Sequence, residues 1–93
     1  MSFLDMSLKD WITETLRERL DPTRLAVEDE SHLHAGHAGW RETGETHFRI
    51  DVVSRAFEGK TRVERHRIVN AALVGAFERG LHALAIQAKA PGE

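Results

Sequence analysis

The sequence has no cysteine and no tyrosine, and it has only two prolines among its 93 residues. Without cysteine, the chain cannot form a disulfide, use a thiol nucleophile or build a cysteine-ligated metal site from its own side chains. No apolar run approaches the roughly 20 residues that span a bilayer, and the first residues lack the basic-then-apolar pattern of a secretory signal. These absences predict a soluble, cytoplasmic protein with no membrane association.

Neither charge sign is in clear excess, since 13 Lys and Arg residues face 15 Asp and Glu residues and the formal net charge is −2. This balance argues against a nucleic-acid binder held by overall charge, although a local basic patch is compatible with it. The sequence also contains no nucleophile elbow, phosphate-binding loop, HExxH motif or spaced pair of catalytic carboxylates. We therefore expect a protein without enzymatic activity.

The composition is that of a small globular protein, with 41% hydrophobic and 30% charged residues. A chain of this length removes ~60–65% of its unfolded surface from water, which is enough for a core without disulfides. We expect a single domain over residues 1–93, with its core at about 8–90.

Two segments have apolar residues at the three- and four-residue spacing that is typical of amphipathic helices. The first covers residues 7–20, where Ser7 is expected to cap the start. The second runs from residue 61 or 62 to 79 and ends at Gly80. A break near residues 63–64 would divide this second segment into two helices.

Three shorter segments alternate between apolar and polar residues, which is the pattern of half-buried strands. They cover residues 24–30, 47–54 and 82–89. The first two are joined by a loop alone and are expected to pair antiparallel, whereas a helical crossover to the third predicts parallel pairing. The predicted fold is therefore α+β, in the order α-β-β-α-α-β around a three-stranded mixed sheet.

Six histidines are the unusual feature of the composition, because imidazole titrates near neutrality and is the commonest metal ligand. The predicted topology brings the end of the first strand and the starts of the other two to one edge of the sheet. Five histidines are expected to meet there, at what we call the histidine rim: His32, His34, His37, His47 and His82.

Two imidazoles do not complete a metal site by themselves, since zinc takes four ligands in structural sites and three plus a water in catalytic ones. The His-x-His-x-x-His spacing of the loop could supply further ligands, but the nearby carboxylates are explained equally well as solvated charges. A shared iron–sulfur cluster, with thiolates from a partner, is another arrangement that histidines allow. The residues by themselves do not choose between these sites. Strand alternation alone makes His82 a half-buried side chain beside the core, and His47 a structural or supporting one.

An ordered set of motifs resembles the BolA family and covers about residues 8–91. The set is specific, although each short motif alone is not. It consists of Glu45-Thr46-His47-Phe48 with Val53-Ser54, Phe57-Glu58-Gly59, Arg65-His66-Arg67 with Val69-Asn70, and Leu81-His82-Ala83-Leu84-Ala85-Ile86. The resemblance implies the BolA fold, which is similar to a class II KH domain.

The resemblance further implies a non-enzymatic partner of a monothiol glutaredoxin, in iron–sulfur cluster trafficking or iron homeostasis. The two proteins would share a bridging [2Fe–2S] cluster together with glutathione, and the free chain, a monomer or weak homodimer, would hold none alone. The family's C-terminal ligand histidine matches His82, and its loop ligand matches His34, with His37 as the next candidate. Ligation requires neutral imidazole, so sharing should weaken below about pH 6.

The alternative that the resemblance implies is a DNA-binding transcriptional regulator of cell morphology and stress response. Its KH-like helix-turn-helix surface would be formed by Lys60, Arg62, Arg65 and Arg67, which could equally contact a protein partner or form a solvated helix face. KH domains grip nucleic acid with a Gly-x-x-Gly loop, but the matching turn here, at residues 59–62, has only its first glycine. Arg65 and His66 are also expected to pack and hydrogen-bond at the start of their helix.

Overall fold

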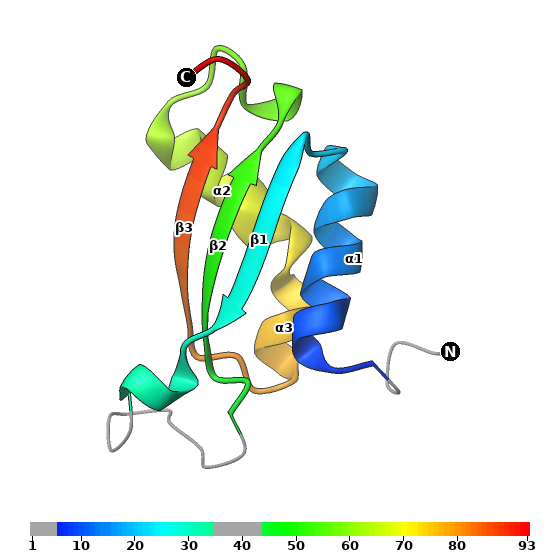
Figure 1. Ribbon diagram of the computed structural model, residues 1–93, viewed down its shortest axis with the longest axis vertical. Coiled ribbons are helices and arrows are strands. Elements are labelled where there is room, and N and C mark those ends of the chain that lie inside the picture. The colour runs from blue at the N-terminus through cyan, green and yellow to red at the C-terminus, as the bar shows by residue number, and fades with distance from the viewer. Residues whose placement is uncertain (1–5, 35–43) are drawn as a thin grey trace.

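The computed structural model describes residues 6–34 and 44–93, in which helices cover one face of a three-stranded sheet (Figure 1). The elements follow one another as α1 (Leu8–Leu20), β1 (Arg24–Asp29), the 3-10 turn η2 (Ser31–His34), β2 (His47–Val53), the 3-10 turn η3 (Arg55–Phe57), α2 (Arg62–Ala72), α3 (Val74–Glu78) and β3 (Ala83–Lys89). The predicted fold class and element order are confirmed. Among the helices of the described residues, none is long and apolar enough to cross a membrane.

The sheet has the strand order β1-β2-β3, so β2 is the central strand. β1 pairs antiparallel with β2, with Asp29 opposite Phe48. β3 pairs parallel with β2, with Ala83 opposite His47. Both predicted pairings are confirmed, and together they bring the end of β1 and the starts of β2 and β3 to the same edge of the sheet (Figure 1).

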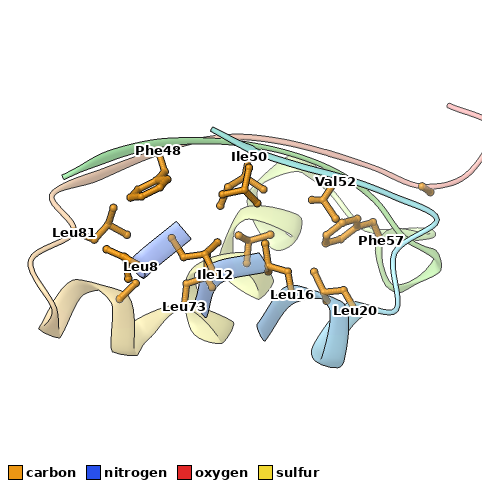
Figure 2. Packing of buried hydrophobic residues seen from close by; sticks show 14 residues of the cluster. Leu8, Ile12, Leu16, Leu20, Phe48, Ile50, Val52, Phe57, Leu73 and Leu81 are labelled. Carbon is orange, nitrogen blue, oxygen red and sulfur yellow. The ribbon is translucent and has the colours of Figure 1, made fainter. Parts of the chain in front are cut away.

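The core lies between the sheet and the helices (Figure 2). α1 buries one side chain per turn because its apolar residues recur at steps of four. β2 buries alternate residues because successive side chains of a strand point to opposite faces. The main buried side chains from these and the neighbouring elements are Leu8, Ile12, Leu16, Leu20, Phe48, Ile50, Val52, Phe57, Val69, Leu73 and Leu81.

The second helical segment does divide, but not where the sequence pattern suggested. Residues 63–64 lie in the first turn of α2, which a capping box stabilises: the Thr61 hydroxyl accepts the Glu64 N–H at 3.1 Å, and Glu64 Oε1 accepts the Thr61 N–H at 2.8 Å. The break falls at Leu73, between α2 and α3. After this break, Gly75 of α3 approaches Trp11 of α1 so closely that a Cβ would lie 3.2 Å from the indole. The predicted break near 63–64 is therefore wrong.

Candidate functional site

Four of the five residues of the histidine rim belong to segments at the sheet edge where β1 ends and where β2 and β3 begin, an edge that Figure 1 shows. His47 is the first residue of β2, His82 immediately precedes β3, and His32 and His34 belong to η2, which directly follows β1. For His34 only the backbone is described, and the loop candidate His37 lies outside the described residues. The topology thus brings together segments that are far apart in sequence, since His32 and His82 are 50 residues apart.

His82 presents an exposed side chain while its backbone is held in place. Its N–H donates to the carbonyl oxygen of Thr46 at 2.7 Å, and the Ala83 N–H donates to the same oxygen at 3.2 Å. The alternation argument that made His82 half-buried is wrong, because β3 starts only at Ala83 and the pattern of inward and outward side chains does not extend to residue 82. An exposed imidazole on a fixed backbone is well suited to bind a ligand.

His47 lies beside His82 but is almost completely covered, with 6% of its surface exposed. The centres of the two imidazole rings are 5.3 Å apart and the ring planes are inclined by 50°. Nδ1 of His47 is 2.8 Å from the hydroxyl of Thr46, which fixes the orientation of the ring. His47 is therefore a structural neighbour of His82, as its strand position indicated.

A hydrogen-bond network pins η2 to the start of β2. The buried hydroxyl of Ser31 accepts the N–H groups of Thr46 at 3.0 Å and His47 at 3.2 Å, and it donates to Oδ1 of Asp29 at 2.5 Å. Asp29 also accepts the Glu45 N–H at 3.0 Å. Burial acts to raise the pKa of Asp29, but the hydrogen bonds from Ser31 and Glu45 outweigh it, so the pKa lies below its ordinary value. The network keeps η2, and with it the backbone of His34, at the rim.

Glu45 links this edge of the sheet to the first helix. Its carboxylate oxygen Oε1 accepts the N–H of Leu8, the first residue of α1, at 2.6 Å. Gly44 precedes it with φ +81°, and a Cβ at that position would lie 3.0 Å from Oδ2 of Asp29. Glycine is required here for both reasons. Sequence reasoning missed Glu45 and Ser31, because only the folded chain brings them to their partners.

The donor chemistry of the rim is that of a partial metal site. In the part of the chain that the structure describes, no three His, Asp or Glu side chains come together to hold a metal ion. The sequence contains no cysteine, so any thiolate ligand must come from another molecule. What the described rim offers to such a molecule is the exposed imidazoles of His82 and His32 and the turn that carries His34.

The basic residues at the start of α2 do not form one uniform surface. Lys60, Arg62 and Arg67 are exposed. Arg65 instead turns toward the end of β3, where its Nη2 lies 2.7 Å from Oε2 of Glu93 and its Nη1 donates to the Ala88 carbonyl at 3.2 Å. The expectation that Arg65 hydrogen-bonds at the helix start is confirmed, since its Nε also donates to the Lys60 carbonyl at 3.0 Å. The DNA-binding alternative stays a prediction.

Comparison with known proteins identifies the family. The family model described as BolA-like protein matches residues 16–93. Because this match covers most of the chain, the protein belongs to the BolA-like family, and the resemblance read from its motifs is confirmed.

Two curated relatives and one solved structure illustrate the similarity. A Sinorhizobium protein from the cobS 5′ region is 49% identical over 95% of this chain and 96% of its own length. The chloroplastic/mitochondrial SufE-like protein 1 of Arabidopsis thaliana is 50% identical over 88% of this chain, which spans 23% of that protein. The structure of the BolA domain of Arabidopsis SufE1 superposes with a TM-score of 0.83 and 48% identity, covering 92% of this chain and 94% of that one.

These relatives bear on two further expectations. The family model and the human relative carry the name BolA-like protein, which states no enzymatic activity, and the lack of catalytic activity in this chain stays a prediction. The chloroplastic/mitochondrial name of one relative shows that the family is not restricted to the cytoplasm. The cytoplasmic location of this chain therefore stays a prediction.

Proposed function

We propose that this protein is a non-enzymatic partner of a monothiol glutaredoxin and shares a bridging [2Fe–2S] cluster with it, in iron–sulfur trafficking or iron homeostasis. His82 is one nitrogen ligand, and the loop supplies the other, His34 first and His37 next. The observation that carries this proposal is the exposed imidazole of His82 on a backbone fixed to Thr46, in a chain that has no cysteine thiolate of its own.

The ligand chemistry of the chain fits such a shared cluster. Iron–sulfur clusters accept histidine in place of cysteine on one iron. A glutaredoxin cysteine and the thiol of glutathione would supply the sulfur ligands, and neutral imidazole would supply the nitrogen. The cluster, when bound, provides the iron that is transferred or sensed. The SufE-like name of one relative agrees with an iron–sulfur role.

The residues around His82 have a positioning role in this proposal. Thr46 accepts the backbone N–H of His82 and contacts Nδ1 of His47 through its hydroxyl, so one residue orients both histidines. The His47 ring then packs against the His82 ring and limits its movement. Metal-binding histidines generally depend on such supporting groups.

The test is a spectroscopic titration of a cluster-loaded monothiol glutaredoxin with this protein. We expect the visible absorption and circular dichroism of the cluster to change, and His82→Ala to abolish the change. His66→Ala is the matched control, since His66 is a half-buried histidine on α2 rather than at the rim. An unaltered response with His82→Ala would remove His82 from the ligand set.

The same titration separates the two loop candidates. If His34 is the second ligand, His34→Ala abolishes the spectral change and His37→Ala leaves it intact. The reverse result assigns the ligand to His37. If both variants respond like the unsubstituted protein, neither His34 nor His37 is required as the second ligand and that part of the proposal fails.

A further inference from the structure

β3 is an edge strand whose outer side is not paired with another strand in the described part of the chain. The N–H of Ala83 and the carbonyl of Lys89 both bond to the β2 side, at 3.2 and 2.9 Å. In a parallel pair, alternate residues make these bonds, so the odd-numbered residues of β3 face β2. The backbone N–H and C=O groups of Leu84 and Ile86 therefore point away from the sheet.

A groove of about 410 Å³ runs between this outer side of β3 and the start of α2. Its lining is cationic, and one of the lining cations, Arg65, is paired with the Glu93 carboxylate. The lining residues are Arg62, Arg65 and His66 from α2 and Ile86, Gln87, Ala88 and Lys89 from β3. The groove therefore combines the two features that an acidic extended chain requires, namely a strand edge and positive charge.

The chain's own Glu93 illustrates the chemistry of this groove. Its carboxylate forms a two-point ion pair with Arg65, and its Oε1 also accepts the N–H of Ala90 at 3.3 Å. Ala90 has an even number, like Leu84 and Ile86, so its backbone N–H also points away from β2. A carboxylate is thus already bound at the end of the edge by a guanidinium and a backbone N–H together.

We propose that this groove binds an extended acidic peptide segment of a partner protein, which adds to β3 as a fourth strand. The peptide backbone pairs with Leu84 and Ile86, and its acidic side chains lie against Arg62 and Lys89. Regularly alternating N–H and C=O groups match another polypeptide strand, because strand addition uses these groups for affinity and side-chain contacts for specificity. The groove lies toward the opposite end of β3 from His82, so this surface is separate from the histidine rim.

The experiment is an NMR titration of the ¹⁵N-labelled protein with the blocked peptide Glu-Val-Glu-Thr-Glu-Val-Glu. We expect shifts and slowed hydrogen exchange at the Leu84 and Ile86 amides, and a weaker response to a peptide with Lys in place of Glu. The double variant Arg62→Glu with Lys89→Glu should weaken binding of the acidic peptide by about tenfold, since it turns two favourable charge pairs with the peptide into unfavourable ones.

Two further arms test strand addition itself. A peptide that is N-methylated at alternate residues, along the edge that would face β3, lacks the backbone N–H groups needed for pairing. This peptide should not bind. His82→Ala should leave peptide binding intact, so this proposal and the cluster proposal can fail independently. Shifts that avoid Leu84 and Ile86, equal binding of the Lys peptide, or displacement of the acidic peptide by oligo-dT would each overturn the proposal.

Discussion

Ser31 is a small side chain on which the geometry of the rim depends. Its hydroxyl contacts Asp29 and the backbone of Thr46 and His47, so it joins the end of β1 to the start of β2 across the loop. It is 3% exposed, which means that water cannot replace these bonds if they are lost. The position of η2 relative to His82 follows from this one residue.

Replacement of Ser31 by alanine should lower the free energy of unfolding by about 1–3 kcal/mol, because two buried N–H groups lose their acceptor. Urea denaturation measures the change. Thr23→Ala is the control, since Thr23 is exposed and its hydroxyl makes only a 3.4 Å bond to Val53, so the effect should stay within about 0.5 kcal/mol. Equal effects of the two substitutions would contradict the role assigned to Ser31.

At the residue scale, the sequence identified the histidines better than it identified their surroundings. His82 stands in a recognisable motif and His47 begins an alternating strand, so both could be located in advance. The bond from Leu8 to Glu45 joins residues 37 apart, and no local pattern encodes it. The exposure of His82 was mispredicted for the same kind of reason, because the exact start of β3 depends on the Thr46 carbonyl.

The start of α2 contains a local capping signal, and the sequence pattern was nevertheless interpreted as a helix break near residues 63–64. Thr61 and Glu64 have the spacing of a capping box, and in the structure each satisfies the other's backbone N–H. The break that divides the helical segment occurs instead at Leu73, where α3 packs Gly75 against Trp11 of α1. This packing is a tertiary effect that helical periodicity does not contain.

Thr61→Ala should destabilise the protein by about 1 kcal/mol, since α2 loses the hydroxyl that caps its first turn. Thermal or urea unfolding provides the measurement. Thr61→Ser retains the hydroxyl and should remain close to the original stability. If the serine variant is as unstable as the alanine variant, the capping bond is not the cause.

The last residues are joined to α2 through an ion pair that responds to pH. The hydrogen bonds from Arg65 are the main cause that lowers the pKa of Glu93 from its ordinary value of 4.5 to about 2. A lowered carboxyl pKa stabilises the folded state above the ordinary value, and this contribution is lost as the pH falls through the lowered one. The contact between Glu93 and Arg65 should therefore persist at pH 4 and be lost toward pH 2.

A ¹³C NMR titration of the Glu93 carboxyl measures this directly. We expect its midpoint near 2 in the unsubstituted protein and near 4.5 in Arg65→Met. Arg67→Met, which removes an exposed cation from the same helix, should leave the midpoint low. A normal midpoint in the unsubstituted protein would show that the ion pair does not form in solution.

At the scale of the whole molecule, the topology was predictable because two simple connection rules apply. A loop between β1 and β2 gives antiparallel pairing, and the helical crossover from β2 to β3 gives parallel pairing. These rules determine which strand ends meet and therefore that the histidines gather at one edge. The groove between β3 and α2 could not be predicted from these rules, because it depends on where the Arg62 and Lys89 side chains lie after folding.

The proposed function predicts a defined stoichiometry. With no cysteine in the chain, a second copy cannot supply the thiolate ligands that the rim lacks. The cluster-bound complex should contain one copy of this protein and one of the glutaredoxin, which native mass spectrometry would measure. A [2Fe–2S] cluster retained by this protein alone, without a thiol-bearing partner, would contradict the shared site.

The anchoring of Glu45 to Asp29 has a consequence for the length of the loop. Asp29 and Ser31 fix the chain before residue 35, and Glu45 fixes it after residue 43, so the strand register does not depend on the length between them. A change in the number of residues between these two anchors should therefore leave the place of His82 before β3 unaltered. Under the proposed function, a different donor residue in this interval could serve as the second ligand without any change to the strands.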